Sequence, residues 1–241
     1  MRTVGVIQAR MASTRLPGKS LEPLAGRPLV LWTVAAMQAV PELANLVVAI
    51  TEERSDDPLA AALGGRVSVH RGPVHDVLRR VQDAVAPFRP DLVVRETADN
   101  PFVDPAVVSA QVTRCIEGGF DYVGTAGWPL GIAAEVARGA ALAEADREAA
   151  EPAEREHVTP FLYSHPERFR VGSLSPTMPL PSGRFTVDTA EDLAFVRAIA
   201  ERLGRERASV ARLRAIVEAE PELVAINAGV RQKTWQEAEV G

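Results

Sequence analysis

Residues 3–19 have the sequence TVGVIQARMASTRLPGK, in which a short apolar run is followed at once by a basic loop. The apolar run Thr3–Ala9 is rich in valine and isoleucine, which predicts a buried β-strand. The loop after it carries three cations, at Arg10, Arg15 and Lys19. Ligands of open α/β sheets bind at the carboxyl ends of the strands, where this loop has to lie. The segment therefore predicts an α/β fold with an anion-binding loop after its first strand.

Apolar runs and helical patterns continue to alternate through the first half of the chain. Further strands are expected at Asn45–Thr51, Arg66–His70, Asp91–Thr97 and Asp121–Thr125. Helices are expected at Pro28–Val40, Asp57–Leu63, Val74–Ala86 and Pro105–Glu117. This alternation is typical of a Rossmann-like, mostly parallel (mixed) sheet with helices on both faces.

The pattern changes after Gly127. Four prolines indicate irregular structure in Trp128–Val136 and Phe169–Gly183. A strand is expected at Arg184–Val187, and helices at Gly139–Ala149, Glu154–Tyr163, Ala190–Gly204 and Ser209–Ile226. We therefore expect one α/β domain over residues 1–241, with residues 127–183 as an inserted subdomain.

The composition is ordinary for a soluble globular protein, with 46% hydrophobic and 24% charged residues among 241. A formal charge of −5 argues against a surface devoted to nucleic acid. The single cysteine, Cys115, excludes an intrachain disulfide and a cysteine-rich zinc site. The first apolar run turns polar at Gln8, too soon for a signal peptide, and the uncharged stretch Pro28–Pro41 is too short to span a bilayer. We expect a cytoplasmic protein without a membrane or nucleic-acid partner.

The chemistry of the basic loop suits an oligophosphate, because cations, hydroxyls and backbone N–H groups occur together. Lys19 and Lys233 are the only lysines among 27 basic residues, so an ammonium at position 19 indicates a specific point-charge contact. Gly18-Lys19-Ser20 matches the end of a P-loop, but Ser13 stands where that motif needs a glycine and Pro17 interrupts it. A basic loop that is merely solvated remains the alternative.

Two aspartates follow predicted strands. Asp99 comes after Asp91–Thr97, and Asp188 comes directly after Arg184–Val187. Magnesium bound to phosphates takes one or two carboxylates, so both are candidate ligands. Asp99 can equally be a turn residue before a proline, whereas Asp188 lies outside the capping box that the next residues predict. Two strand-end carboxylates with a cationic loop predict a metal-assisted phosphoryl site.

Residues Gln8–Lys19 resemble the signature loop of CTP-dependent sugar nucleotidyltransferases, in particular the spore coat polysaccharide biosynthesis branch. CMP-sialate and CMP-KDO synthetases are more distant members of this group, and the similarity extends from Val4 to about Ile199. The resemblance implies the nucleotide-diphospho-sugar transferase type of fold. It also implies transfer of CMP from CTP to a sugar or sugar-acid acceptor with release of pyrophosphate, for polysaccharide or glycoconjugate biosynthesis. Magnesium is the implied cofactor and a homodimer the implied assembly.

The resemblance also assigns roles to particular residues. Catalytic roles fall to Lys19, Arg10 and Arg15; nucleotide binding to Gln8, Ala9, Arg10, Ser13, Arg15, Lys19, Arg71, Gly72 and Asp76; acceptor binding to Glu135, Arg155 and Glu156; metal binding to Asp99 and Asp188. Ala98 stands where the family pattern has a glycine, and Ala133 where relatives commonly have an aspartate, which leaves the sugar open.

Structural explanations remain open for some of these residues. Asp76 can belong to the first turn of a helix, and Arg155 and Glu156 to a solvated helix face. Two other function classes also remain: a nucleotide-sugar-dependent glycosyltransferase and a non-catalytic nucleotide-binding protein. The first usually has an Asp-x-Asp motif, which the relevant strand end lacks. The second is disfavoured because Lys19, Asp99 and Asp188 occur together.

Overall fold

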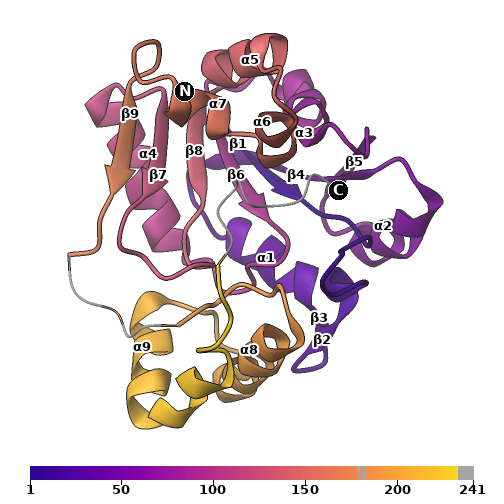
Figure 1. Ribbon diagram of the computed structural model, residues 1–241, viewed down its shortest axis with the longest axis vertical. Coiled ribbons are helices and arrows are strands. Elements are labelled where there is room, and N and C mark those ends of the chain that lie inside the picture. The colour runs from indigo at the N-terminus through magenta and orange to yellow at the C-terminus, as the bar shows by residue number, and fades with distance from the viewer. Residues whose placement is uncertain (178–179, 181–182, 233–241) are drawn as a thin grey trace.

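A single seven-stranded sheet forms the centre of the computed structural model, which describes residues 1–177, 180 and 183–232 (Figure 1). The order in the sheet is β5-β4-β1-β6-β8-β7-β9. These strands are β1 Thr3–Gln8, β4 Leu43–Thr51, β5 Ser68–Gly72, β6 Leu92–Thr97, β7 Tyr122–Thr125, β8 Glu135–Arg138 and β9 Val171–Leu174. Only β8 runs antiparallel to its neighbours among the described strands of this sheet. The expected α/β class with a mostly parallel sheet is confirmed.

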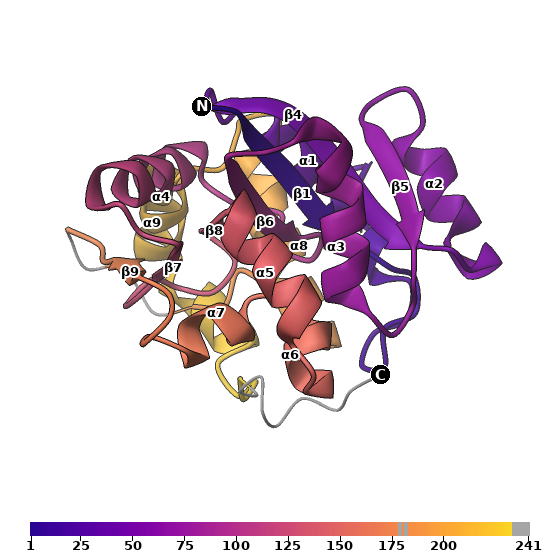
Figure 2. The same cartoon turned by 90° about the horizontal axis from the view of Figure 1, so that it is seen from above.

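Helices cover both faces of this sheet (Figure 2). They are α1 Leu29–Met37, α2 Asp57–Leu63, α3 Val77–Val85, α4 Pro105–Gly118, α5 Gly139–Glu148, α6 Pro152–His157, α7 Pro160–Ser164, α8 Ala190–Leu203 and α9 Val210–Ala219. Short 3₁₀ helices occur at Lys19–Leu21, Arg54–Asp56, Ala86–Phe88 and Pro221–Ile226, and a small ribbon pairs β2 Pro23–Leu24 with β3 Arg27–Pro28.

The apolar strands are buried on both sides. Val48 and Ile50 pack with α1, α2 and α4, whereas Val47 and Ala49 of the same strand pack with α3, α5 and α7. This double burial explains why β4 is continuously apolar instead of alternating. A third cluster packs α8 and α9 against Trp32 below the sheet, where Figure 1 shows these helices in orange and yellow.

Two stretches expected to be irregular contain strands. Residues 135 and 136 open β8, and residues 171–174 form β9. The prediction failed because both strands are short and obtain their partners from distant residues: Val136 pairs with Val94 and Val123. Residues 127–183 therefore supply two strands of the central sheet. The division into one domain with an insertion stays a prediction.

The strand expected at residues 184–187 does not form. Its backbone bonds go to two separate loops, from Phe185 N–H to Leu130 O at 2.9 Å and from Val187 N–H to Asp99 O at 2.9 Å. The second of these bonds ties the segment before α8 to the loop after β6. It therefore brings the two strand-end aspartates of the sequence prediction close together.

Helix boundaries also differ from expectation, and the helix expected at residues 209–226 ends at Ala219, before the 3₁₀ helix Pro221–Ile226. The helix expected at residues 154–163 is interrupted between α6 and α7, where Val158 has a φ of 76° and Pro160 begins the next helix. The helix expected at residues 74–86 begins only at Val77, because the Asp76 carboxylate accepts a bond from Arg79 N–H and caps it. The capping box of Thr189 and Asp192 at α8 is confirmed.

Candidate active site

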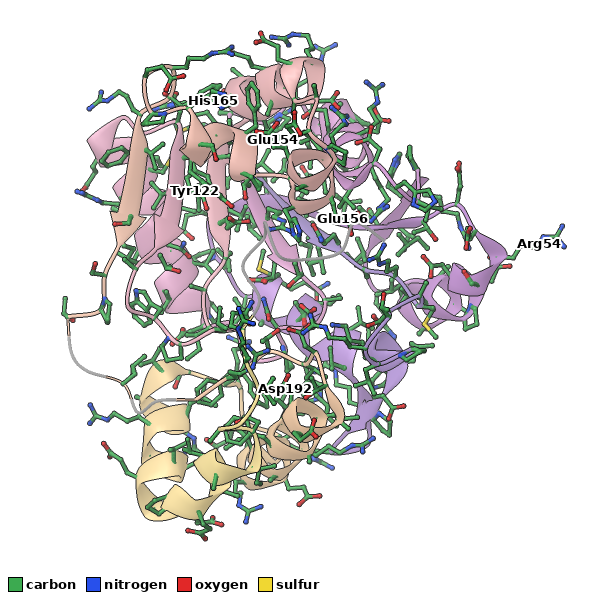
Figure 3. All side chains as sticks on the ribbon, in the orientation of Figure 1. Arg54, Tyr122, Glu154, Glu156, His165 and Asp192 are labelled. Carbon is green, nitrogen blue, oxygen red and sulfur yellow. The ribbon has the colours of Figure 1, made fainter. Side chains whose placement is uncertain are left out.

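A cavity of about 490 Å³ lies at the carboxyl ends of β1 and β6. Its lining combines the basic loop, the loop after β6, α6 and the segment before α8. The described lining includes Gln8, Ala9, Arg10, Ser13, Arg15, Lys19, Arg80, Arg95, Thr97, Asp99, Asn100, Glu156, His157, Thr186 and Asp188. In Figure 3, Glu156 belongs to α6 and Asp192 to α8, on either side of the edge where these strands end. The cavity thus lies where open α/β sheets bind ligands.

Lys19 is the centre of the charged network in this cavity. Its Nζ donates to Asp99 Oδ2 at 2.7 Å, to Val187 O at 2.7 Å and to Asp188 Oδ1 at 3.1 Å. Burial lowers the pKa of Lys19, but the two carboxylates outweigh it and raise that pKa above its ordinary value. The ammonium therefore stays charged at neutral pH.

Asp99 is held in its ionised form. Burial raises its pKa, but the Lys19 ammonium and the Thr97 hydroxyl, which donates to Oδ1, bring that pKa below its ordinary value. Asp188 forms ion pairs with two arginines, with Arg15 at 3.0 Å and with Arg184 at 3.1 Å. Two carboxylates with cationic partners thus face one point in the cavity.

The residues at that point fit a divalent cation. Both carboxylates lie within 3.1 Å of one ammonium nitrogen, so their oxygens converge on a single positive charge. No group of three or more His, Cys, Asp or Glu side chains within the described part of the chain could hold a metal alone. Magnesium characteristically uses one or two carboxylates and completes its shell with water and substrate phosphates. Asp99 and Asp188 match that donor set.

The remaining loop residues of the prediction lie in the same cavity. Arg10 forms an ion pair with Glu156 at 3.2 Å, which places a residue predicted to bind acceptor against the basic loop. Gln8 accepts two bonds from Arg95, at 2.7 and 3.0 Å. Ala9 and Ser13 line the cavity as well. The loop therefore presents its charged and polar groups together.

Glu135 has several internal partners. Its Oε1 accepts bonds from Tyr122 at 2.5 Å and Thr159 at 2.7 Å, while Oε2 pairs with Arg95. Burial raises the pKa of Tyr122 well above its ordinary value, and Glu135 raises it further, so the phenol keeps its proton and donates. Glu135 lines a second, smaller cavity beside the first.

The structure does not bring five predicted residues into the main cavity: Glu135, which lines the second cavity, and four others. Arg71 forms an exposed ion pair with Asp57 at 2.6 Å. Gly72 is buried, and a Cβ there would stand 3.0 Å from Arg80 Cγ. Asp76 caps α3 and pairs with Arg155 at 2.8 Å, and Arg155 also pairs with Asp146. The structural explanation left open for Asp76, a place at the start of a helix, is confirmed. Arg155 does not lie on a solvated helix face, because its side chain is partly buried and pairs with carboxylates of two other elements.

Arg80 and His157 line the cavity but were not singled out from the sequence. Arg80 is 2% exposed and has no ion-pair partner among the described residues. Burial lowers its pKa, and Arg10 lowers it further. His157 has a buried Nε2 without a partner in the described chain, and its pKa is lowered by burial and then by Arg95. Arg80 could have been identified from the sequence as a charged residue on the otherwise apolar face of α3.

Comparison with known proteins agrees with this geometry. A family model described as Cytidylyltransferase matches residues 4–209. The spore coat polysaccharide biosynthesis protein SpsF of Bacillus subtilis is 35% identical over 207 residues, covering 83% of this chain and 86% of its own. The 3-deoxy-manno-octulosonate cytidylyltransferase of Bdellovibrio bacteriovorus is 37% identical over 103 residues, covering 43% of this chain and 41% of its own. A solved cytidylyltransferase from Leptospira borgpetersenii has a TM-score of 0.87 at 26% identity, covering 93% of this chain and 97% of its own.

The matched residues 4–209 contain the basic loop, both strand-end aspartates and α6. The family resemblance of residues 8–19 is confirmed, and so is the fold it implied. The cations and the paired carboxylates of the cavity lie within that matched stretch, and the lining residue Gln232 lies outside it. The chain accordingly belongs to the cytidylyltransferase family, whose enzymes transfer CMP from CTP.

Proposed function

We propose that the cavity binds magnesium-CTP with the triphosphate on the basic loop, and that the enzyme transfers CMP to a hydroxyl of a sugar acid. The observation that carries this is the contact of one lysine, Lys19, with both Asp99 and Asp188. The sugar acid is supported by the relative from Bdellovibrio, named for 3-deoxy-manno-octulosonate, and the biosynthetic setting by the relative from Bacillus.

The reaction needs positioning and charge stabilisation more than covalent help from the protein. The acceptor hydroxyl attacks the α-phosphorus and releases its proton to solvent, the bond to the β-phosphate oxygen breaks, and pyrophosphate leaves with the electron pair. Arg10, Arg15 and Lys19 stabilise the charge that develops on the phosphate oxygens. Asp99 and Asp188 would hold magnesium, which supplies further neutralisation of that charge.

Binding of the nucleotide requires partner exchange in the Lys19 network. The ammonium and a metal ion cannot both occupy the point between the two carboxylates. Lys19 would turn from the carboxylates to the phosphates of the nucleotide, and Asp99 and Asp188 would then be free to hold magnesium. Arg80 donates through Nη1 to the carbonyls of Pro73 and Val74 and has no ion-pair partner among the described residues, so the rest of its guanidinium is offered to acceptor atoms of the nucleotide.

The proposal also covers assembly and location. The family resemblance supports a cytoplasmic homodimer in which residues 127–183 take part. None of the described helices is both long enough and apolar enough to cross a membrane. Sedimentation of the purified chain tests the dimer, which would appear at twice the 25.9 kDa of the chain.

Pyrophosphate release tests the activity. The enzyme is mixed with CTP, magnesium and each of a set of sugar acids, beginning with 3-deoxy-manno-octulosonate and N-acetylneuraminate. We expect release that depends on both metal and acceptor and is much slower with UTP or GTP. Equal use of the three nucleotides would contradict the cytidylyl assignment, and cleavage of nucleotide sugars instead of CTP would favour a glycosyltransferase.

A further inference from the structure

A second cavity, of about 180 Å³, adjoins the main one. The two share Arg95, Thr97, Asn100, Leu130 and Gly131 in their walls. A molecule in the second cavity would therefore lie beside the wall that carries the loop after β6. An acceptor in the second cavity would thus lie next to a triphosphate in the main cavity.

Two polar atoms of this second cavity are buried without a hydrogen-bond partner in the described chain. Glu96 is 3% exposed, and its Oε1 accepts bonds from Thr97 N–H at 2.8 Å and Asn100 Nδ2 at 2.6 Å. Its Oε2 has no partner, and neither has Oδ1 of Asn100. Both residues line the cavity. Buried polar atoms are nearly always bonded, so this pair points to a ligand.

The two atoms are complementary in chemistry. Burial raises the pKa of Glu96 to about 8, so its carboxyl is mostly neutral at pH 7. Because Oε1 already accepts two bonds, the proton belongs on Oε2, which becomes a donor. Asn100 Oδ1 is an acceptor because its Nδ2 is already used in donating. The cavity thus offers one donor and one acceptor.

Few charged groups lie near Glu96. Arg95 lowers its pKa and Asp99 raises it. Glu135, in the same cavity, is paired with Arg95. Helix α1 has no ionisable residue, and on α4 Arg114 stacks over Phe120 while Glu117 is exposed. No cation within the described residues forms an ion pair with Glu96.

We propose that the second cavity binds the acceptor sugar, and that Glu96 and Asn100 select it by bonding one of its hydroxyl groups. This hydroxyl accepts a bond from Glu96 Oε2 and donates one to Asn100 Oδ1. The inference rests on the proposed function, and it makes Glu96 a specificity-determining residue with no part in the phosphate chemistry.

A hydroxyl is the group that matches both atoms. A carboxylate of the sugar can only accept, which would leave Asn100 Oδ1 without a partner, and an ammonium can only donate, which would leave the Glu96 proton without one. A sugar lacking this hydroxyl would leave both protein atoms unpaired. Sites built in this way reject the analogue that lacks the group.

Steady-state kinetics of Glu96→Gln and Glu96→Leu test the proposal, with 3-deoxy-manno-octulosonate and N-acetylneuraminate as probes. The glutamine amide donates at every pH, so its KM for the sugar should stay flat from pH about 6.5 to about 9.5. The wild-type KM should rise above pH about 8, as Glu96 loses its proton. Glu96→Leu should raise the sugar KM by about 10-fold or more at every pH, with the KM for CTP unchanged.

Fluorescence of Trp128, which also lines the second cavity, reports sugar binding without turnover. A change on adding either sugar with CMP should disappear in Trp128→Phe and weaken in Glu96→Leu. Glu117→Leu, at an exposed position of α4, is the matched control and should behave as wild type. If Glu96→Leu does not fold, Asn100→Ala and the pH profile of Glu96→Gln decide the matter.

The outcomes separate this inference from the proposed function. Pyrophosphate release by the wild type with an unchanged sugar KM and pH profile in the Glu96 variants would overturn the inference alone. Sugar binding that depends on Glu96 without any CMP transfer would overturn the proposed function alone. No binding and no use of either sugar would overturn the assignment of the cavity.

Discussion

The loop side of the cavity and the sides formed by α3 and α6 satisfy their polar groups in opposite ways. On the loop side, Lys19, Asp99 and Asp188 are bonded to one another. Across the cavity, Arg80 has no carboxylate partner and donates to the backbone carbonyls of Pro73 and Val74, while His157 Nε2 has no hydrogen-bond partner in the described chain. Charges paired with each other have to exchange partners when a ligand binds, whereas groups without a charged partner are available to it at a cost in stability. We therefore expect mutations on the loop side to affect chemistry, and mutations across the cavity to affect binding.

The largest effect should come from the two aspartates. Asp99→Asn and Asp188→Asn should each lower kcat by about 10³-fold, because each removes a ligand of the same metal. The double variant should be little worse than either single one, since the two act as a unit. Magnesium-dependent pyrophosphate release across the four proteins measures this. Asp83→Asn, which alters an exposed ion pair with Arg79, is the control; additive losses would show that the aspartates do not share an ion.

Lys19→Ala should lower turnover by about 10²-fold, the usual result of losing a transition-state phosphate contact. The KM for CTP should change less, because the arginines still attract the triphosphate. Kinetics under saturating magnesium-CTP measure the loss. Arg54→Ala is the control, since the Arg54 side chain points away from the molecule (Figure 3). An unchanged rate in Lys19→Ala would show that the loop side of the cavity does not take part in the reaction.

Across the cavity, Arg80→Lys should raise the KM for CTP by about 10-fold and leave kcat nearly unchanged. Lysine keeps the charge but loses the planar donor array of the guanidinium. Calorimetric titration with CTP and steady-state kinetics should agree on this. Arg79→Lys, on the neighbouring exposed position, should bind CTP like the wild type. A loss confined to kcat would contradict the assignment of binding to the side of the cavity formed by α3 and α6.

Glu96→Gln should raise thermal stability in a pH-dependent way. The pKa of Glu96 in the folded chain is about 8, above the value of 4.5 for an unperturbed glutamate. The folded state binds the proton more tightly, so stability falls as pH rises through this window and levels off above about 8. The variant should therefore melt a few degrees above wild type at pH about 8 and no higher near pH 4. Melting curves decide this, with Glu117→Gln as control; a constant offset would contradict it.

The smallest effects should come from residues outside the cavity. Arg71→Ala and Arg155→Ala should change both KM values by less than about 2-fold, because their partners are Asp57, Asp76 and Asp146. Arg155→Ala should lower the melting temperature, since Asp76 loses its ion-pair partner and Asp146 keeps only Arg79 among the described residues. A rise of about 10-fold or more in either KM would support the roles that the family resemblance gives these two arginines.

The sequence predicts the parts of this fold that depend on local pattern. Valine-rich runs identify β1, β4 and β6, and the loop after β1 is recognisable because its cations are close in sequence. β8 and β9 escape prediction because their partners lie on distant strands. Arg80 and Glu96 escape it because a charged residue in a helix or strand is usually solvated, and only tertiary packing buries these two. Conversely, Asp76 and Arg155 form an ion pair with each other, and no local sequence pattern predicts that pairing.

The contacts of Lys19 have a consequence for the order in which the protein folds. The lysine is separated from Asp99 by 80 positions and from Asp188 by 169. Contacts of such separation form late, because the intervening chain must be ordered first. A nascent chain therefore emerges from the ribosome with its basic loop but without the second carboxylate, and both proposed metal ligands come together only when residues 183–188 have been synthesised and docked. Under the proposed function, a product truncated before Asp188 is not expected to consume CTP.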